Sequence, residues 1–187
     1  MSIFGIVIIA FALAMISFSV AYLSSFFRCQ NLPGMLRTAF SLAVFQGAMF
    51  GLGYLIAIAL KGLLSQFSWP IVIIILMALG FKMILISRKA KPTERAFDFS
   101  HLRLLIGVSF ASGINAFLVG LALGIISMDL IPALPIVAGA SFCLSIIGLI
   151  LGRTSGNLRY SKLAEFIGGL MVILTGLLLL VEYLQLI

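Results

Sequence analysis

Six apolar segments follow one another along the chain, each close to the roughly 20 residues that an α-helix needs to cross a bilayer. They cover roughly residues 3–24, 36–60, 69–87, 102–127, 131–152 and 163–186. Only 9% of the residues are charged and 63% are hydrophobic, which excludes a water-soluble domain. A β-barrel is excluded because the segments are continuously apolar and do not alternate. The sequence therefore predicts an all-α membrane protein with six transmembrane helices in one domain, residues 1–187.

The first segment is predicted to be a membrane span and not a cleaved signal peptide. It has no basic residues before it and no small-x-small cleavage site before Arg28. It is also longer than the hydrophobic region of a signal peptide, which has about 7–15 residues.

Basic residues are concentrated in the loops of one side. That side receives Arg28, Arg37, Arg88, Lys89, Lys91, Arg95, Arg103, Arg153, Arg159 and Lys162. The other side receives only Lys61, and Lys82 lies inside the third segment. The positive-inside rule places the ten residues in the cytoplasm, with both termini outside. We therefore expect a multi-pass protein of a bacterial inner membrane. Its expected partner is the lipid bilayer, and it is not expected to bind nucleic acid.

Two stretches near the starts of the chain halves are similar to each other. "AMISFSVA" (14–21) matches "GINAFLVG" (113–120) at an offset of 99 residues, which aligns Ile16 with Asn115. The same offset aligns Gln46 with Ser145. "LGFKMIL" (79–85) resembles "IGGLMVIL" (167–174) at a shorter offset. The common order of these matches predicts a duplication.

A duplicated unit with three spans must enter the membrane the second time from the opposite face. The predicted architecture is thus two inverted three-helix repeats, about 1–90 and about 101–187, joined by a basic cytoplasmic linker at about 87–101. In such proteins the substrate site lies near the membrane midplane, where the repeats meet.

Glycines four residues apart occur in "GAMFG" (47–51), "GLALG" (120–124) and "GLILG" (148–152). This spacing allows helix backbones to approach closely. The packing could join helices of one chain or of two chains. The sequence therefore leaves open whether the chain forms a homo-oligomer.

Uncharged polar residues at mid-depth are the candidates for a solute site. A carboxamide left unpaired in hydrocarbon costs several kcal/mol, so Gln46 and Asn115 must each face a partner or water. Serines often bond to their own helix backbone instead. The candidate substrate-binding set is Asn115, Gln46, Ser112, Ser17, Ser19 and Ser145. Whether they bind a solute or hold helices together is left open by the sequence.

Charged residues are expected away from this site. Glu94 and Asp98 lie in the linker, Asp129 in a loop, and Glu165 and Glu182 near opposite ends of the sixth segment. We therefore expect no intramembrane carboxylate near the site to carry protons. Lys82 is expected to extend toward the cytoplasmic edge, with a role as counter-ion for a substrate as the alternative.

No enzyme is predicted. His101, the only histidine, is expected to be a solvated loop residue, and Cys29 and Cys143 have no disulfide or metal spacing. The chain has no cluster of nucleophile and base and no phosphate-binding loop. No resident cofactor is expected.

Several motifs together resemble those of the manganese efflux pumps, the MntP-like family within the lysine-exporter-type superfamily. They are "AFALAMISFSVA", "LRTAFSLAVFQGAMFGLG", "LGFKMIL", "ASGINAFLVGLALGI", "IIGLILGR" and "IGGLMVIL", which together cover most of the chain. The resemblance implies a transporter that exports Mn²⁺ from the cytoplasm, with the ion as substrate and not as a cofactor.

The chain departs from the family pattern at three positions. The pattern has aspartate at Ile16, glutamate at Gln46 and aspartate at Asn115. Mn²⁺ prefers carboxylate, carbonyl and water oxygens, so Asn115 and Gln46 are metal positions by family resemblance that have lost their charge. We expect a transporter with a neutralised metal site. The alternatives are an exporter of another small neutral or anionic solute, or a non-transporting membrane protein on the same scaffold.

Overall fold

A computed structural model of the chain describes residues 3–27, 31–64, 68–89, 102–126, 129–154, 157 and 159–184. They form six α-helices: α1 (Ile3–Phe27), α2 (Leu32–Leu64), α3 (Ser68–Lys89), α4 (Leu102–Ile125), α5 (Leu130–Thr154) and α6 (Arg159–Leu184). Each helix is long and apolar enough to cross a membrane, which confirms the prediction of six transmembrane helices. His101, Cys29 and most of the basic linker lie outside the described residues.

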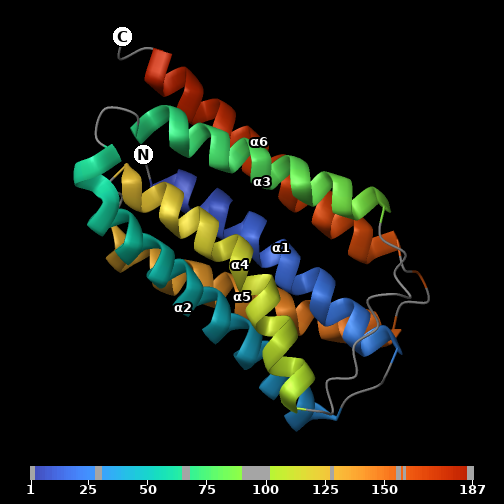
Figure 1. The fold of residues 1–187 in the computed structure, drawn as a ribbon. Coiled ribbons are helices and arrows are strands. Elements are labelled where there is room, and N and C mark those ends of the chain that lie inside the picture. Colours follow the sequence, from blue (N-terminus) through green and yellow to red (C-terminus); the bar gives the residue numbers. More distant parts are fainter. Residues whose placement is uncertain are drawn as a thin grey trace.

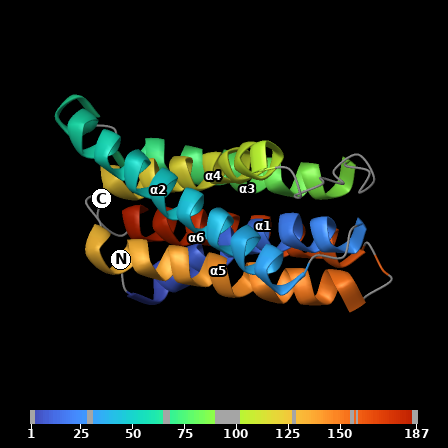
Figure 2. The same cartoon turned by 90° about the horizontal axis from the view of Figure 1, so that it is seen from below.

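The helices form two layers of three (Figure 2). One layer contains α2, α4 and α3, with α4 between the other two, and the second contains α5, α1 and α6, with α1 in the middle. Exchanging α1 with α4, α2 with α5 and α3 with α6 converts one layer into the other. This arrangement is compatible with the predicted inverted repeat.

The two chain halves are interleaved in this fold. The largest helix–helix contacts are α2 with α4 and α1 with α5, followed by α3 with α6. Each of these pairs joins a helix of the first half to a helix of the second. Within the described residues, the one contact of any extent inside a half is the small one between α1 and α2. The hydrophobic core is therefore shared by the two halves.

Successive helices run in opposite directions, so that the helix ends gather at two faces (Figure 1). We call one face the basic end, because the helix ends there carry Arg37, Arg88, Arg103, Arg153, Arg159 and Lys162. The start of α1 and the end of α6 lie together at the opposite face. The described basic residues thus follow the sidedness expected from the sequence.

Glycines set the distance between the interleaved helices. A Cβ on Gly53 of α2 would collide with the Phe117 carbonyl oxygen of α4, and one on Gly152 of α5 would collide with the Tyr22 carbonyl oxygen of α1. Gly53 and Gly152 are the two glycines that the offset of 99 residues aligns. The predicted close packing therefore occurs within the chain, at corresponding places in the two layers.

Prolines lie near the starts of two helices. Pro70 and Pro132 lie in the first turns of α3 and α5, where a helix tolerates proline. Pro135 lies inside α5, because that helix already begins at Leu130. Cys143, on the same helix, is a free and exposed thiol.

Candidate functional site

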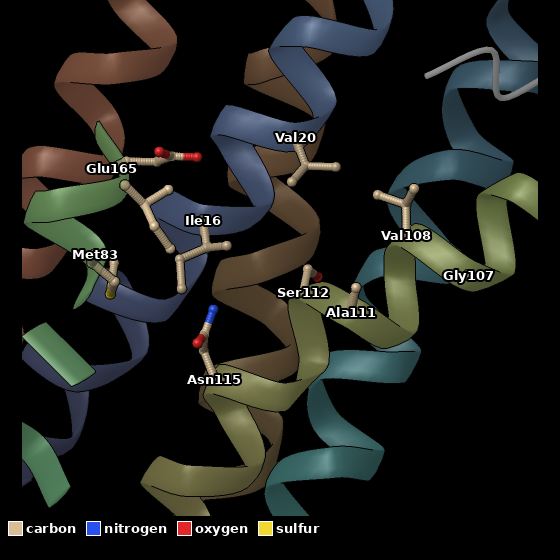
Figure 3. A pocket seen from close by; sticks show the side chains of 10 residues that line it. Ile16, Val20, Met83, Gly107, Val108, Ala111, Ser112, Asn115 and Glu165 are labelled. Carbon is tan, nitrogen blue, oxygen red and sulfur yellow. The ribbon is translucent and has the colours of Figure 1, made fainter. Parts of the chain in front are cut away.

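A cavity of about 430 Å³ opens between α1, α3, α4 and α6. Its walls are mostly apolar, and Figure 3 shows its residues from close by. They are Ile16, Val20, Met83, Ile86, Gly107, Val108, Ala111, Ser112, Asn115 and Glu165. We call this space the central cavity, because it lies between the two layers beside the central helices α1 and α4.

The position of the cavity follows from the packing of the central helices. α1 and α4 touch each other only slightly, whereas α1 packs tightly against α5 and α4 packs tightly against α2. The contact of α4 with α3 is also small. The α4 residues that line the cavity extend from Gly107 to Asn115, which is the half of the helix nearer the basic end. Toward the opposite face, fully buried apolar residues such as Leu76 and Leu123 fill the interior. The central cavity therefore occupies the half of the membrane next to the basic end.

Asn115 lies at mid-depth, as the fourteenth of 24 residues in α4. Its carboxamide is half-buried, lines the central cavity and points toward Ile16 of α1 (Figure 3). The Nζ of Lys82, on α3, donates a hydrogen bond of 3.4 Å to the Asn115 Oδ1. Lys82 is itself exposed, and this bond directs its ammonium group toward the cavity residue Asn115.

Gln46 lies in different surroundings. It is fully buried and does not line the central cavity. Its Nε2 donates to the Leu13 carbonyl oxygen at 2.9 Å, and its Oε1 accepts a hydrogen bond from the Ser17 hydroxyl. Both contacts join α2 to α1. The amide is thus satisfied by protein groups, and the structure does not bring Gln46 and Asn115 together.

The other candidate serines occupy three kinds of place. Ser112 lines the cavity and donates to the Ser109 carbonyl oxygen at 3.3 Å in its own helix. Ser145 of α5 is buried, and its hydroxyl has no partner among the described residues. Ser19 of α1 is fully buried and bonds to α6.

Glu165 lies near the start of α6, as expected, but the sequence analysis missed that it belongs to the site. It lines the central cavity and is only 7% exposed. The Ser19 hydroxyl donates to its Oε1 at 3.0 Å, and the hydroxyl groups of Ser19 and Ser161 are 2.7 Å apart. A carboxylate therefore does lie within the membrane at the site, contrary to the expectation.

The error came from the boundary of the sixth span. The polar residues "RYSK" lowered the apparent hydropathy, so the span was expected to begin at residue 163, whereas α6 begins at Arg159. Glu165 is the seventh residue of the helix, about 9 Å along its axis at 1.5 Å per residue. The nearby "FIGG" (166–169) could have indicated this, because Gly168 and Gly169 pack against α1 and α3 and fix that part of α6 inside the bundle.

The chemistry available in the central cavity is limited to a few polar groups. Glu165 offers a carboxylate, Asn115 a carboxamide and Ser112 a hydroxyl. Within the described part of the chain, no three His, Cys, Asp or Glu residues form a group that could hold a metal ion. A hard cation would therefore have one charged ligand, with amide, hydroxyl and water oxygens completing its coordination.

Comparison with known proteins agrees with this architecture. The family described as "Putative manganese efflux pump" matches residues 29–180. The chain belongs to this family. A protein of Wolinella succinogenes with the name "Putative manganese efflux pump MntP 1" is 31% identical over 96% of this chain and 97% of its own length. One of Methanobrevibacter smithii is 32% identical over 97% of this chain and 98% of its own length. One of Aliarcobacter butzleri is 28% identical over 92% and 96%. No solved structure matches the chain.

The family relationship confirms the resemblance seen in the motifs, and it identifies the chain as a multi-pass membrane protein of a transporter family. The relatives from Wolinella succinogenes and Methanobrevibacter smithii match the chain along nearly their whole length, and their names refer to manganese efflux.

Proposed function

We propose that this efflux pump homologue exports a small cation from the cytoplasm, with Mn²⁺ as the first substrate to test. The observation that carries the proposal is Glu165, a carboxylate that lines a membrane cavity next to the basic end. An ionisable residue inside a membrane span is costly, and such residues mark ion or substrate pathways. The names of the relatives supply the choice of metal.

The polar residues divide into two roles in this proposal. Asn115 and Ser112 contact the solute together with Glu165, because all three line the central cavity. Ser19 orients the Glu165 carboxylate. Gln46 and Ser17 hold α2 against α1, so they act on the shape of the site and do not bind the metal. Ser145 remains a candidate only for a conformation in which its hydroxyl meets water.

The orientation in the membrane is part of the proposal. We place the basic end in the cytoplasm of the inner membrane, in accordance with the positive-inside rule, and both termini outside. In this orientation the cavity faces the compartment from which an exporter must take its substrate.

A second candidate function rests on Lys82. Its ammonium group bonds to Asn115, at a position where the family pattern has aspartate. An aspartate there would neutralise Lys82, whereas asparagine leaves a positive charge beside the cavity. This favours export of a neutral or anionic solute over export of a divalent cation.

Rescue of a manganese-sensitive bacterial strain without its own exporter separates the two functions. We expect the native chain to restore growth in manganese and Glu165→Gln to abolish the rescue at equal membrane expression. Rescue by a variant with Ile16→Asp, Gln46→Glu and Asn115→Asp, but not by the native chain, would show that the native site serves another solute. Failure of both, at normal expression, would refute manganese export on this scaffold.

A further inference from the structure

A second pocket, of about 450 Å³, lies between α3 and α6 at the basic end. The two helices lie side by side there (Figure 1). The lining residues are Ser87, Asn157, Arg159, Tyr160, Lys162, Leu163 and Phe166. None of them lines the central cavity, so this pocket is not part of the candidate transport site. We call it the interfacial pocket, because the membrane spans of α3 and α6 have their boundaries beside it, at Arg88 and Arg159.

The interfacial pocket is positively charged. Arg159 and Lys162 line it, and among the described lining residues there is no Asp or Glu. Glu165, one turn farther along α6, lines the central cavity instead. Both cations lie in the first turn of α6, which contains no acidic residue. Positive side chains in a first turn oppose the helix dipole, so an anion in the pocket would be stabilised by the two side chains and by the helix end together.

The polar wall of the interfacial pocket is held in place by buried groups. The hydroxyl of Tyr22, a fully buried residue of α1, donates to the Asn157 carbonyl oxygen at 2.7 Å. The Asn157 Oδ1 in turn accepts a hydrogen bond of 3.0 Å from the backbone N–H of Arg159. On α3, Ser87 is only 5% exposed and donates to the Ile84 carbonyl oxygen at 2.8 Å. The backbone on both sides of the pocket is therefore fixed by the fold.

The interfacial pocket becomes apolar toward the membrane interior. Leu163 and Phe166 line it one and two turns along α6 from Arg159. Leu163 is 53% exposed, and in a membrane this surface faces lipid chains. Phe166 lies about 10 Å from Arg159 along the helix axis, at 1.5 Å per residue. Cations at the depth of the headgroups, next to an apolar wall at the depth of the chains, match the two parts of a phospholipid. A free anion would use only the first part.

We propose that the interfacial pocket binds one anionic phospholipid, with its phosphate group between Arg159 and Lys162 and an acyl chain along Leu163 and Phe166. The guanidinium group can donate two parallel hydrogen bonds to the phosphate, and the ammonium group supplies a second charge. Basic pockets between transmembrane helices are suited to lipid headgroups of this kind. The bound lipid joins α3 to α6 at the basic end. The inference does not depend on which solute the central cavity takes.

The test measures lipid binding to the purified full-length chain in detergent by native mass spectrometry. Phosphatidylglycerol and phosphatidylcholine with the same acyl chains differ in headgroup charge, and inorganic phosphate is the third ligand. We expect phosphatidylglycerol to bind about tenfold more tightly than phosphatidylcholine, because two basic side chains attract its net negative charge. Millimolar phosphate should not displace it. Displacement by phosphate, or equal binding of the two lipids, would overturn the proposed occupant.

Paired substitutions separate a site from the general charge of the basic end. Arg159→Gln with Lys162→Gln should lower phosphatidylglycerol binding to the level of phosphatidylcholine. Arg37→Gln with Arg103→Gln is the matched control and should keep native binding, because it removes the same charge from exposed residues outside the pocket. The exchange Arg159→Lys with Lys162→Arg keeps both charges and should keep most of the binding. Equal loss in the two neutralised variants would overturn the site.

A photoreactive phosphatidylglycerol locates the lipid in the native protein and requires no variant to fold. Labelling should be concentrated on peptides that contain Leu163 and Phe166. Labelling spread evenly over the six helices would overturn the proposal, even if anionic lipids bind more tightly than zwitterionic ones.

Discussion

Gln46 and Asn115 are both carboxamides within membrane spans, but their surroundings differ. Gln46 donates and accepts within the α1–α2 contact and is fully buried, whereas Asn115 lines the central cavity. The two residues should therefore respond differently to substitution. Loss of Gln46 should affect folding, and loss of Asn115 should affect the solute.

Gln46→Leu should lower the stability of the fold by about 1–3 kcal/mol, because the hydroxyl of Ser17 loses its partner in a buried position. Thermal unfolding of the purified protein in detergent, followed by size-exclusion chromatography, measures this change. Asn115→Leu is the matched control and should unfold within a few degrees of the native protein. A Gln46→Leu protein with native unfolding temperature and impaired transport would contradict the structural role.

Lys82→Met tests the charge beside the cavity. Removing the ammonium group that bonds to Asn115 lowers the electrostatic repulsion of a divalent cation, so we expect manganese export several-fold faster than that of the native chain. Arg88→Met, which removes an exposed cation near the end of the same helix, is the control and should change the rate little. Slower manganese export in Lys82→Met would mean that the ammonium group assists transport.

At the scale of helices, the glycine contacts determine how closely the helices within one layer pack against each other. Gly120 of α4 lies against the Phe50 carbonyl oxygen of α2, where a methyl group would collide with backbone atoms that cannot move independently. Gly120→Ala should therefore destabilise the protein by about 1–3 kcal/mol through overpacking. Gly139 of α5 has open space at its Cβ position. Gly139→Ala should be neutral or stabilising by up to about 1 kcal/mol, since alanine favours the helix.

Unfolding temperatures of these two variants, compared in the same detergent, check the prediction. Equal effects of Gly120→Ala and Gly139→Ala would mean that the α2–α4 contact is looser than the structure indicates.

The helices themselves could be predicted because their apolar length is a local property of the sequence. The six spans follow from hydropathy, and the loop charges predict which helix ends lie on the same side. The site could be predicted only in part. Asn115 and Ser112 line the cavity, but the separation of Gln46 from Asn115 depends on how α1 packs between its neighbours, which no local pattern contains. Glu165 was missed as a site residue because a helix start among polar residues is not visible in hydropathy.

For the molecule as a whole, the orientation can be tested by labelling from the two sides. In a background with Cys29→Ser and Cys143→Ser, Asp129→Cys should react with a membrane-impermeant thiol reagent added outside intact cells. Asn157→Cys, at the basic end, should react only after the membrane is opened. The reverse pattern would mean that the basic end faces outward.

We expect the two halves of the chain to form one folding unit, because nearly every large contact crosses between the halves. If the gene is divided within the segment between α3 and α4, each product lacks the helices that its own helices pack against. We expect either product alone to be degraded, and the two expressed together to reassemble and restore transport. The same interleaving means that a harmful substitution in one half can be corrected by a change in the other half, about a hundred residues away. Compensating changes should therefore be sought across the linker and not beside the original substitution.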